Sequence, residues 1–250
     1  MPTSPDRVDV ARAIGATWAA ELDPRVRRWS LLLSAGEVEL ARAERDAYDG
    51  GGTLTPFLAL QVVERGLATV DVLLALARGA RSDLDGVRAA LDVLGGADAV
   101  NERLRRGGNL TRAHADGSSR VVPAEHAEAV AALTGNPAYA DARTVLLGHR
   151  SAGLAAALVP EGAAEVGPTL WHARATSGGV RHDGGLLVLP DGTELAVHCF
   201  TELGADGPDD GPDEGLDDGP DDVLDAVARA FATTLRLLGH RGLTDPGRPA

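Results

Sequence analysis

The chain has 250 residues, of which 44% are hydrophobic and 3% aromatic, and its formal net charge is −13. A chain of this length can bury a large core, as one domain or as one domain with two lobes. The composition offers no basic, aromatic-bearing face for nucleic acid, and no apolar run approaches the length that spans a membrane.

Lysine is absent, because all 24 basic residues are arginine. This excludes Schiff-base chemistry, a phosphate-loop lysine and a serine–lysine catalytic pair. A GC-rich codon bias also turns lysine into arginine, but the chemical consequence is the same. The single cysteine, Cys199, excludes a disulfide within the chain, and its apolar surroundings predict a buried, inert thiol. The N-terminus carries no charged-then-apolar signal pattern, which predicts a cytoplasmic protein.

The first elements are predicted to be a helix and a hairpin. Ser4 can cap the helix with Pro5 at its first position, and apolar residues then recur every fourth position from Val10 to Leu22. The stretch 29–43 consists of two strand-like runs around a short turn that contains glycine, which predicts a β-hairpin.

A long helical block is predicted to follow. The glycine-rich run Asp49–Thr53 breaks the strand pattern, and Pro56 then opens a helix that ends near Gly66. From Val70 to Gly153 the chain is expected to be wholly helical, interrupted only by glycine-rich breaks.

Strand character returns in 184–200, where the turn signal at 190–192 predicts a second hairpin. A final helix is predicted from Val223 to Leu238, with Gly239 as its C-terminal stop. The element order therefore predicts an α/β (α+β) fold: a mainly antiparallel sheet flanked by N- and C-terminal helices, with an inserted all-helical lobe. The expected lobes are 1–50 plus 165–250 (α/β) and 51–164 (all-helical).

An acidic segment, 203–222, separates the second hairpin from the last helix. It contains nine of the 37 acidic residues in a Gly-Pro-Asp repeat that repels itself and cannot bury a core, so we predict a mobile, solvated loop. A calcium site is the alternative, but the spacing does not match an EF-hand loop and the prolines oppose a wrapped cage.

Three stretches resemble motif regions of the serine β-lactamase and penicillin-binding protein superfamily, nearest to the class A β-lactamase-like serine hydrolases. They are "GGTLTPFLALQVVER" (51–65), "SDLDGVRAALDVLGGADAVNERLRRGG" (82–108) and "HARATSGGVRHDGGLLVLPDGTELAV" (172–197). The first resembles the end of the Ser-x-x-Lys motif and its helix, the second the Ser-Asp-Asn segment, and the third the strand that opens with His-Lys-Thr-Gly. The resemblance implies a β-lactamase/transpeptidase-like fold.

The resemblance also implies that the Ser-x-x-Lys chemistry is lost. With Pro56 as the reference, Gly51 stands where the family has its nucleophilic serine and Leu54 where it has its lysine. A shift of two residues would offer Thr53 as the nucleophile, but Pro56 would then occupy the position of the base.

The other two motifs match in part. Ser82 and Asp83 correspond to the first two residues of Ser-Asp-Asn, and His172 to the histidine that precedes Lys-Thr-Gly, which here reads Ala-Arg-Ala. Arg181 matches a family arginine that helps to bind a substrate carboxylate. The loop that supplies a deacylating glutamate in class A enzymes is shortened to the stretch 114–119, "HADGSS", which lacks glutamate.

The ionisable cluster around 171–183 is the candidate site, and we expect it to lie on the edge strand and turn beside the family's cleft. Histidines can move protons near neutral pH and arginines can bind oxyanions in a forked geometry. The candidate catalytic residues are His172, His182, Asp183, Ser82 and Asp83. The candidate substrate-binding residues are Arg174, Arg181 and Thr53. Each has a structural alternative: a structural Arg–Asp pair with a capped strand end at 181–183, a packed His172, and a helix N-cap at Ser82–Asp83.

Two functions stay open from the sequence. One is a repurposed acid–base enzyme (cyclase, isomerase, lyase or hydrolase) that acts on a small anionic metabolite in biosynthesis without an acyl-enzyme. The other is a non-catalytic protein that binds a ligand or a partner. We expect no cofactor and no catalytic metal, because no metal-ligand spacing is found among four further histidines, His114, His126, His149 and His198.

Overall fold

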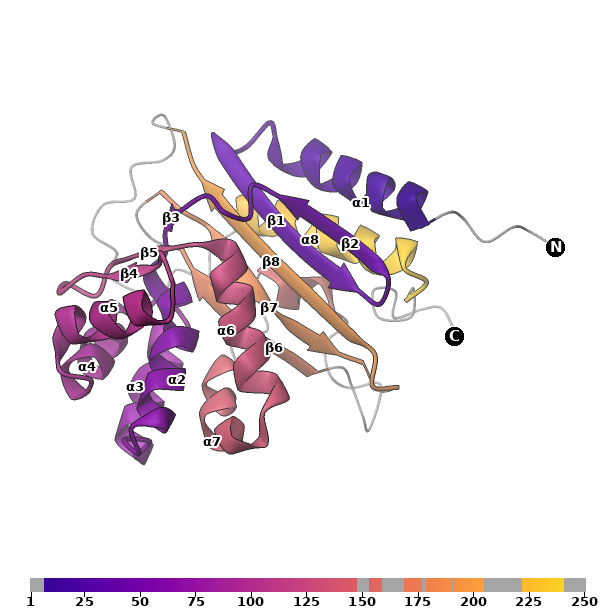
Figure 1. The fold of residues 1–250 in the computed structure, drawn as a ribbon. Coiled ribbons are helices and arrows are strands. Elements are labelled where there is room, and N and C mark those ends of the chain that lie inside the picture. Colours follow the sequence, from indigo (N-terminus) through magenta and orange to yellow (C-terminus); the bar gives the residue numbers. More distant parts are fainter. Residues whose placement is uncertain are drawn as a thin grey trace.

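Figure 1 shows the protein as a computed structural model, which describes residues 7–147, 153–158, 169–176, 179–189, 191–204 and 222–240. Several residues with sequence-based predictions lie outside these ranges. They are Ser4, Pro5, His149, Pro190 and residues 205–221 of the acidic segment.

The main sheet has five antiparallel strands in the order β2-β1-β8-β7-β6. The strands are β1 (Arg28–Ala35), β2 (Val38–Arg42), β6 (Thr169–Ala175), β7 (His182–Val188) and β8 (Glu194–Glu202). The register of the central pair runs from Arg28 opposite Glu202 to Ala35 opposite Leu195. Because β1 and β8 come from opposite ends of the chain, the sheet joins the two ends, as predicted.

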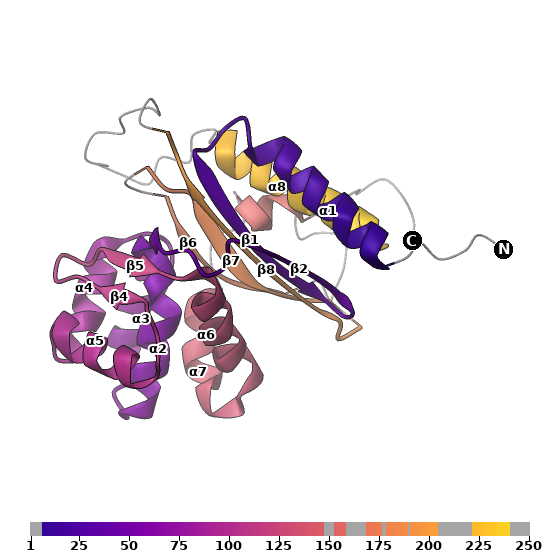
Figure 2. The same cartoon turned by 45° about the horizontal axis from the view of Figure 1, so that its top comes forward.

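Two helices, α1 (Arg7–Leu22) and α8 (Asp222–Leu237), cover one face of this sheet (Figure 2). The predicted apolar stripe of the first helix is confirmed, because Ile14, Trp18 and Leu22 are fully buried. The Trp18 indole N–H donates to the Thr234 hydroxyl at 3.0 Å, which links the two terminal helices. Gly239 adopts a φ of 94°, a conformation that suits glycine and ends the last helix where predicted.

The other helices gather on the opposite side of the sheet (Figures 1 and 2). They are α2 (Thr55–Glu64), α3 (Val70–Gly79), α4 (Leu84–Val93), α5 (Gly96–Arg106), α6 (Pro123–Gly135) and α7 (Ala140–Arg143). Helix α6 packs directly on β7 and β8. A second hydrophobic core lies between these helices and the sheet and includes Leu58, Leu76, Leu186 and Phe200.

The prediction that Val70–Gly153 is wholly helical is wrong. Strands β4 (Arg112–Ala113) and β5 (Ser119–Val121) join β3 (Tyr48–Asp49) in a small sheet with the order β3-β5-β4. The stretch "HADGSS" forms the tight turn between β4 and β5, with Gly117 at a φ of 88°. β5 pairs with β3, which is distant in sequence, and with β4, and both β4 and β5 are too short to show a periodicity of their own.

Short 3₁₀ helices complete the structure: η1 (Gly51–Leu54), η2 (Pro137–Tyr139), η3 (Thr144–Leu146) and η4 (Gly153–Ala157). The lobe boundaries at residues 50 and 165 stay a prediction. Within the described ranges, no helix combines the length and apolarity needed to cross a bilayer.

Candidate functional site

The three stretches that carry the resemblance meet at the outer edge of β6. The Arg174 N–H donates to the Ala80 carbonyl oxygen at 3.0 Å, and the Ser82 hydroxyl donates to the Arg174 carbonyl oxygen, also at 3.0 Å. Helix η1 packs against the same strand. Because β6 is the last strand of the sheet, these contacts occupy hydrogen-bonding groups that an edge strand would otherwise expose.

Neither a nucleophile nor a base stands at the Ser-x-x-Lys position. Gly51 has a φ of 43°, a backbone conformation that favours glycine, and Leu54 is fully buried. The shifted candidate Thr53 is also fully buried, and its hydroxyl donates to the Gly50 carbonyl oxygen at 2.6 Å. The Thr53 hydroxyl is therefore hydrogen-bonded to the backbone of its own turn.

Gly52 brings the backbone of η1 into close contact with β6. A Cβ atom at this position would lie less than 3.0 Å from the carbonyl oxygens of both Arg174 and Gly79. Both obstacles are backbone atoms, which cannot move aside by a rotamer change. The space between η1 and the strand is therefore filled by main chain.

Asp83 caps helix α4. Its side-chain Oδ1 accepts from the N–H groups of Asp85 at 2.9 Å and Gly86 at 3.3 Å. The N-cap alternative is therefore confirmed for Asp83. Ser82 has a φ of 75°, and its hydroxyl donates to the Arg174 carbonyl oxygen.

A buried histidine–carboxylate pair joins β6 and β7. His172 Nδ1 lies 2.7 Å from Asp183 Oδ1, and Asp183 Oδ2 accepts from the Leu154 N–H of η4 at 2.9 Å. A carboxylate only accepts hydrogen bonds, so Nδ1 is the donor. In the strand register Arg174 lies directly opposite Asp183, so these three side chains share one face of the sheet. Asp183 therefore orients His172 and not His182.

The sheet separates the predicted cluster into two groups. Leu187 of β7 belongs to the core beneath α1 and α8, whereas Leu186 belongs to the core beneath α2–α6. Because alternate residues of a strand face opposite sides, Asp183 lies on the face of α1 and α8 and His182 on the other. The sequence predicted one cluster, and the structure contains two.

His182 is fully buried and uses both ring nitrogens. Nδ1 accepts from the Thr201 N–H at 3.0 Å, and Nε2 donates to the Asp49 carbonyl oxygen at 2.6 Å. Burial lowers the pKa of His182 to about 4, so the ring is neutral near pH 7. A ring with both nitrogens occupied by the backbone has no lone pair left for substrate, which argues against a catalytic role.

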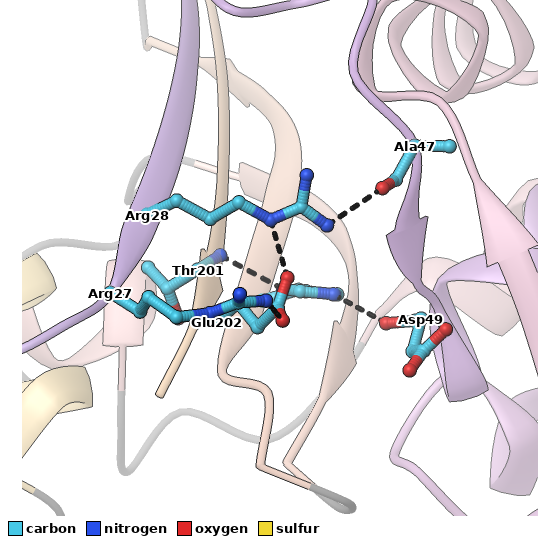
Figure 3. Close-up of polar contacts among 7 residues, drawn as sticks. Arg27, Arg28, Ala47, Asp49, Thr201 and Glu202 are labelled. Carbon is cyan, nitrogen blue, oxygen red and sulfur yellow. Dashed lines mark hydrogen bonds and ion pairs between the residues drawn. The ribbon is translucent and has the colours of Figure 1, made fainter. Parts of the chain in front are cut away.

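Arginines beside this histidine tie β3 to the main sheet. Figure 3 shows Arg27 and Arg28 both directed at the Glu202 carboxylate. Arg28 Nη2 also donates to the Ala47 carbonyl oxygen at 3.0 Å, and its guanidinium lies 4.4 Å from the centre of the Tyr48 ring. These contacts fix the chain where it leaves the main sheet for the helices, a structural role that the sequence did not signal.

The two candidate anion-binding arginines differ in their contacts. Arg181 Nη1 donates to the carbonyl oxygens of Thr176 and Val180 at 3.0 and 2.9 Å, which ties the turn before β7. Arg174 is buried to the same extent, with 8% of its surface exposed, but its Nη1 has no hydrogen-bond partner in the described parts of the chain. Nη1 of Arg174 is thus a buried donor without an acceptor among these residues.

A contact between two buried histidines was not predicted from the sequence. His126 of α6 and His198 of β8 approach within 3.0 Å between their Nδ1 atoms. Burial lowers the pKa of His198 to about 3, and burial followed by repulsion from His198 and His182 lowers the pKa of His126 well below its usual value. The two residues are 72 positions apart, so no spacing in the sequence connects them.

A cavity elsewhere in the protein is lined by none of the predicted catalytic or substrate-binding residues. The cavity, of about 320 Å³, lies between the start of α5 and the β4–β5 turn, where Asp98, Asn101 and His114 line it. Over the described ranges, no group of three or more His, Cys, Asp or Glu residues is arranged to hold a metal ion. Cys199 is fully buried, and burial raises the pKa of its thiol, as expected for an inert cysteine.

Searches against protein-family models and curated proteins found no match. Solved structures of similar fold include a β-lactamase from Xanthomonas campestris (TM-score 0.69, 16% identity, 91% of this chain and 97% of that one). A β-lactamase from Sphaerobacter thermophilus (0.66, 20%, 91% and 97%) and a mutant of PBP-A in an acyl-enzyme complex with penicillin G (0.69, 14%, 96% and 99%) are also similar. The chain therefore has the β-lactamase/transpeptidase-like fold that the motifs predicted. Identities this low establish the fold alone.

We predict that Gly52→Ala destabilises the protein by roughly 1–3 kcal/mol or more, because its methyl group must displace backbone carbonyl groups. Gly135→Ala is the matched control: it lies at the end of α6 with no atom within 4 Å of the added Cβ, and it should be neutral or slightly stabilising. Urea denaturation measures both free energies of unfolding. Equal stabilities for the two variants would show that the main-chain contact at η1 is not formed.

We also predict that the free energy of unfolding falls as the pH drops from about 6.5 towards 4. The folded-state pKa values of His182 and His198 lie below the usual value of 6.5, so in this window the unfolded chain binds protons that the folded chain does not. His198→Gln should remove a slope of up to about 1.4 kcal/mol per pH unit. Urea denaturation at several pH values compares it with His114→Gln, an exposed control that should keep the wild-type slope. Parallel curves for wild type and His198→Gln would contradict the prediction.

Proposed function

We propose that the protein is a non-catalytic member of its fold class that binds a small anionic ligand and forms no acyl-enzyme. The observation that carries this proposal is the closed edge of β6, where the main chain of η1 and of residues 79–82 occupies the region in which the three motif stretches meet. This arrangement argues against an acyl-enzyme, and the buried Nη1 of Arg174, which has no partner among the described residues, favours an anionic ligand.

Acyl transfer needs a hydroxyl group and a base that takes its proton, and a positioned general base contributes about 10²–10⁴-fold to the rate. The two candidate hydroxyls at the motif stretches, those of Thr53 and Ser82, both donate to backbone carbonyl oxygens. With Leu54 at the position of the family's lysine and no lysine in the chain, the amine that would activate a hydroxyl is missing.

A second candidate function is an acid–base enzyme that acts on a small anionic metabolite. The observation that favours it is the 2.7 Å contact between His172 and Asp183, because a carboxylate on Nδ1 leaves Nε2 as the proton-transferring atom. Arg174 lies on the same face and could orient an anion. The cytoplasmic location and the biosynthetic role stay predictions from the sequence.

The first prediction concerns covalent chemistry. The purified protein should neither hydrolyse nitrocefin nor become labelled by a fluorescent penicillin, because the Thr53 and Ser82 hydroxyls both donate to backbone carbonyl oxygens. Denaturing gels and mass spectrometry measure the label, with an active class A β-lactamase as positive control. Labelling at Thr53 or Ser82 would refute the proposed function.

The second prediction separates the two candidates. A non-catalytic protein should promote no exchange of C–H hydrogen for deuterium when small carboxylates and phosphate esters are incubated with it in D₂O and followed by proton NMR. An acid–base enzyme that abstracts a carbon-bound proton would exchange one substrate signal, and His172→Asn would abolish that exchange. Such a result would favour the second candidate over the first.

A further inference from the structure

Arg174 is the buried charge that the described parts of the chain leave uncompensated. Only 8% of its surface is exposed, its Nη1 atom is inaccessible, and within the described residues its guanidinium takes part in no ion pair. An isolated cation away from water is strongly unfavourable unless an acceptor or a counter-ion satisfies it. Arg181 has the same exposed fraction, but its guanidinium donates to the carbonyl oxygens of Thr176 and Val180.

The carboxylate opposite Arg174 in the sheet does not fill this role. Asp183 lies opposite Arg174 in the register of β6 and β7, but one of its oxygens accepts from His172 and the other from the Leu154 N–H. Its two oxygens are therefore directed at other donors.

His172 supplies a second group on the same face. It lies two residues before Arg174 on β6, and Asp183 holds its Nδ1, so its Nε2 is directed away from that carboxylate. Nε2 has no hydrogen-bond partner among the described residues, while the side chain as a whole is 4% exposed. Because Nδ1 carries the proton, Nε2 of the neutral ring is an acceptor, and it can donate to a ligand only when the ring is protonated.

We propose that Arg174 is the anchor of a binding site for a small oxyanion, a carboxylate or a phosphoryl group. His172, positioned by Asp183, adds a second donor when its ring is protonated. This inference rests on the ligand-binding role proposed above and gives it a place and a ligand class. A guanidinium presents parallel N–H donors that match a carboxylate or phosphate edge. The small exposed fractions limit the occupant to a small anion or to the terminal oxyanion of a longer ligand.

The test is an anion titration of the whole protein at constant ionic strength, with chloride as the balancing salt. The Tm of the wild type should rise with acetate, with inorganic phosphate, or with both, since a ligand that binds only the folded state stabilises it in proportion to ln(1 + [L]/Kd). The acetate arm detects a carboxylate site and the phosphate arm a phosphoryl site. Broadening of the probe's NMR signal measures binding without reference to stability.

Two variants localise the effect. Arg174→Met should abolish the anion-dependent rise and, in chloride alone, should be at least as stable as the wild type, because it removes an unpaired buried charge. Arg120→Met, at an exposed position of β5, should keep the wild-type response. Arg174→Gln, which keeps polar groups without the charge, should also lose the response and serves if the methionine variant does not fold.

The inference is overturned if neither acetate nor phosphate raises the Tm and neither probe's NMR signal broadens. It is also overturned if the response survives in the Arg174 variants. That outcome leaves the proposed absence of acyl-enzyme chemistry intact, because penicillin labelling tests it separately. Penicillin labelling would refute the proposed function whatever the anions do.

Discussion

The hydrogen bonds between the outer edge of β6 and residues 80–82 are the constraint on which the function of this chain depends. An edge strand exposes backbone donors and acceptors, and here the Arg174 N–H and carbonyl group are satisfied by Ala80 and Ser82. The close approach of Gly52 requires a residue without a side chain and fills the adjoining space with main chain. The same contacts that stabilise the junction between sheet and helices therefore occupy the place where the motif stretches meet.

The alternation of side chains along a strand decides the rest of the site. One step along β7 places His182 beneath the helices, where Thr201 and Asp49 hold both its nitrogens. The next residue, Asp183, lies on the opposite face with His172 and with Arg174, whose Nη1 has no partner among the described residues. What reads in the sequence as one cluster of charges is thus a structural histidine on one side of the sheet and a candidate anion site on the other.

The sequence predicted the fold correctly but only some of the contacts of the candidate site. The periodic helices and hairpins, the joining of both chain ends in one sheet and the β-lactamase/transpeptidase-like fold are confirmed. The short strands β4 and β5 were missed because two or three residues show no periodicity and because the pairing of β5 with β3 joins segments distant in the chain. The contact between His126 and His198 was missed for the same reason, since 72 residues separate them.

The sequence by itself determined which residue types stand at the motif positions: the chain has no lysine, and Gly51 and Leu54 occupy the positions that the resemblance assigns to serine and lysine. Residue type is a local property, so its absence needs no structure. Only the tertiary structure decided which groups are satisfied. Whether a buried arginine meets an acceptor depends on strand register and on segments distant along the chain, and these separate Arg174 from Arg181 although both are equally buried.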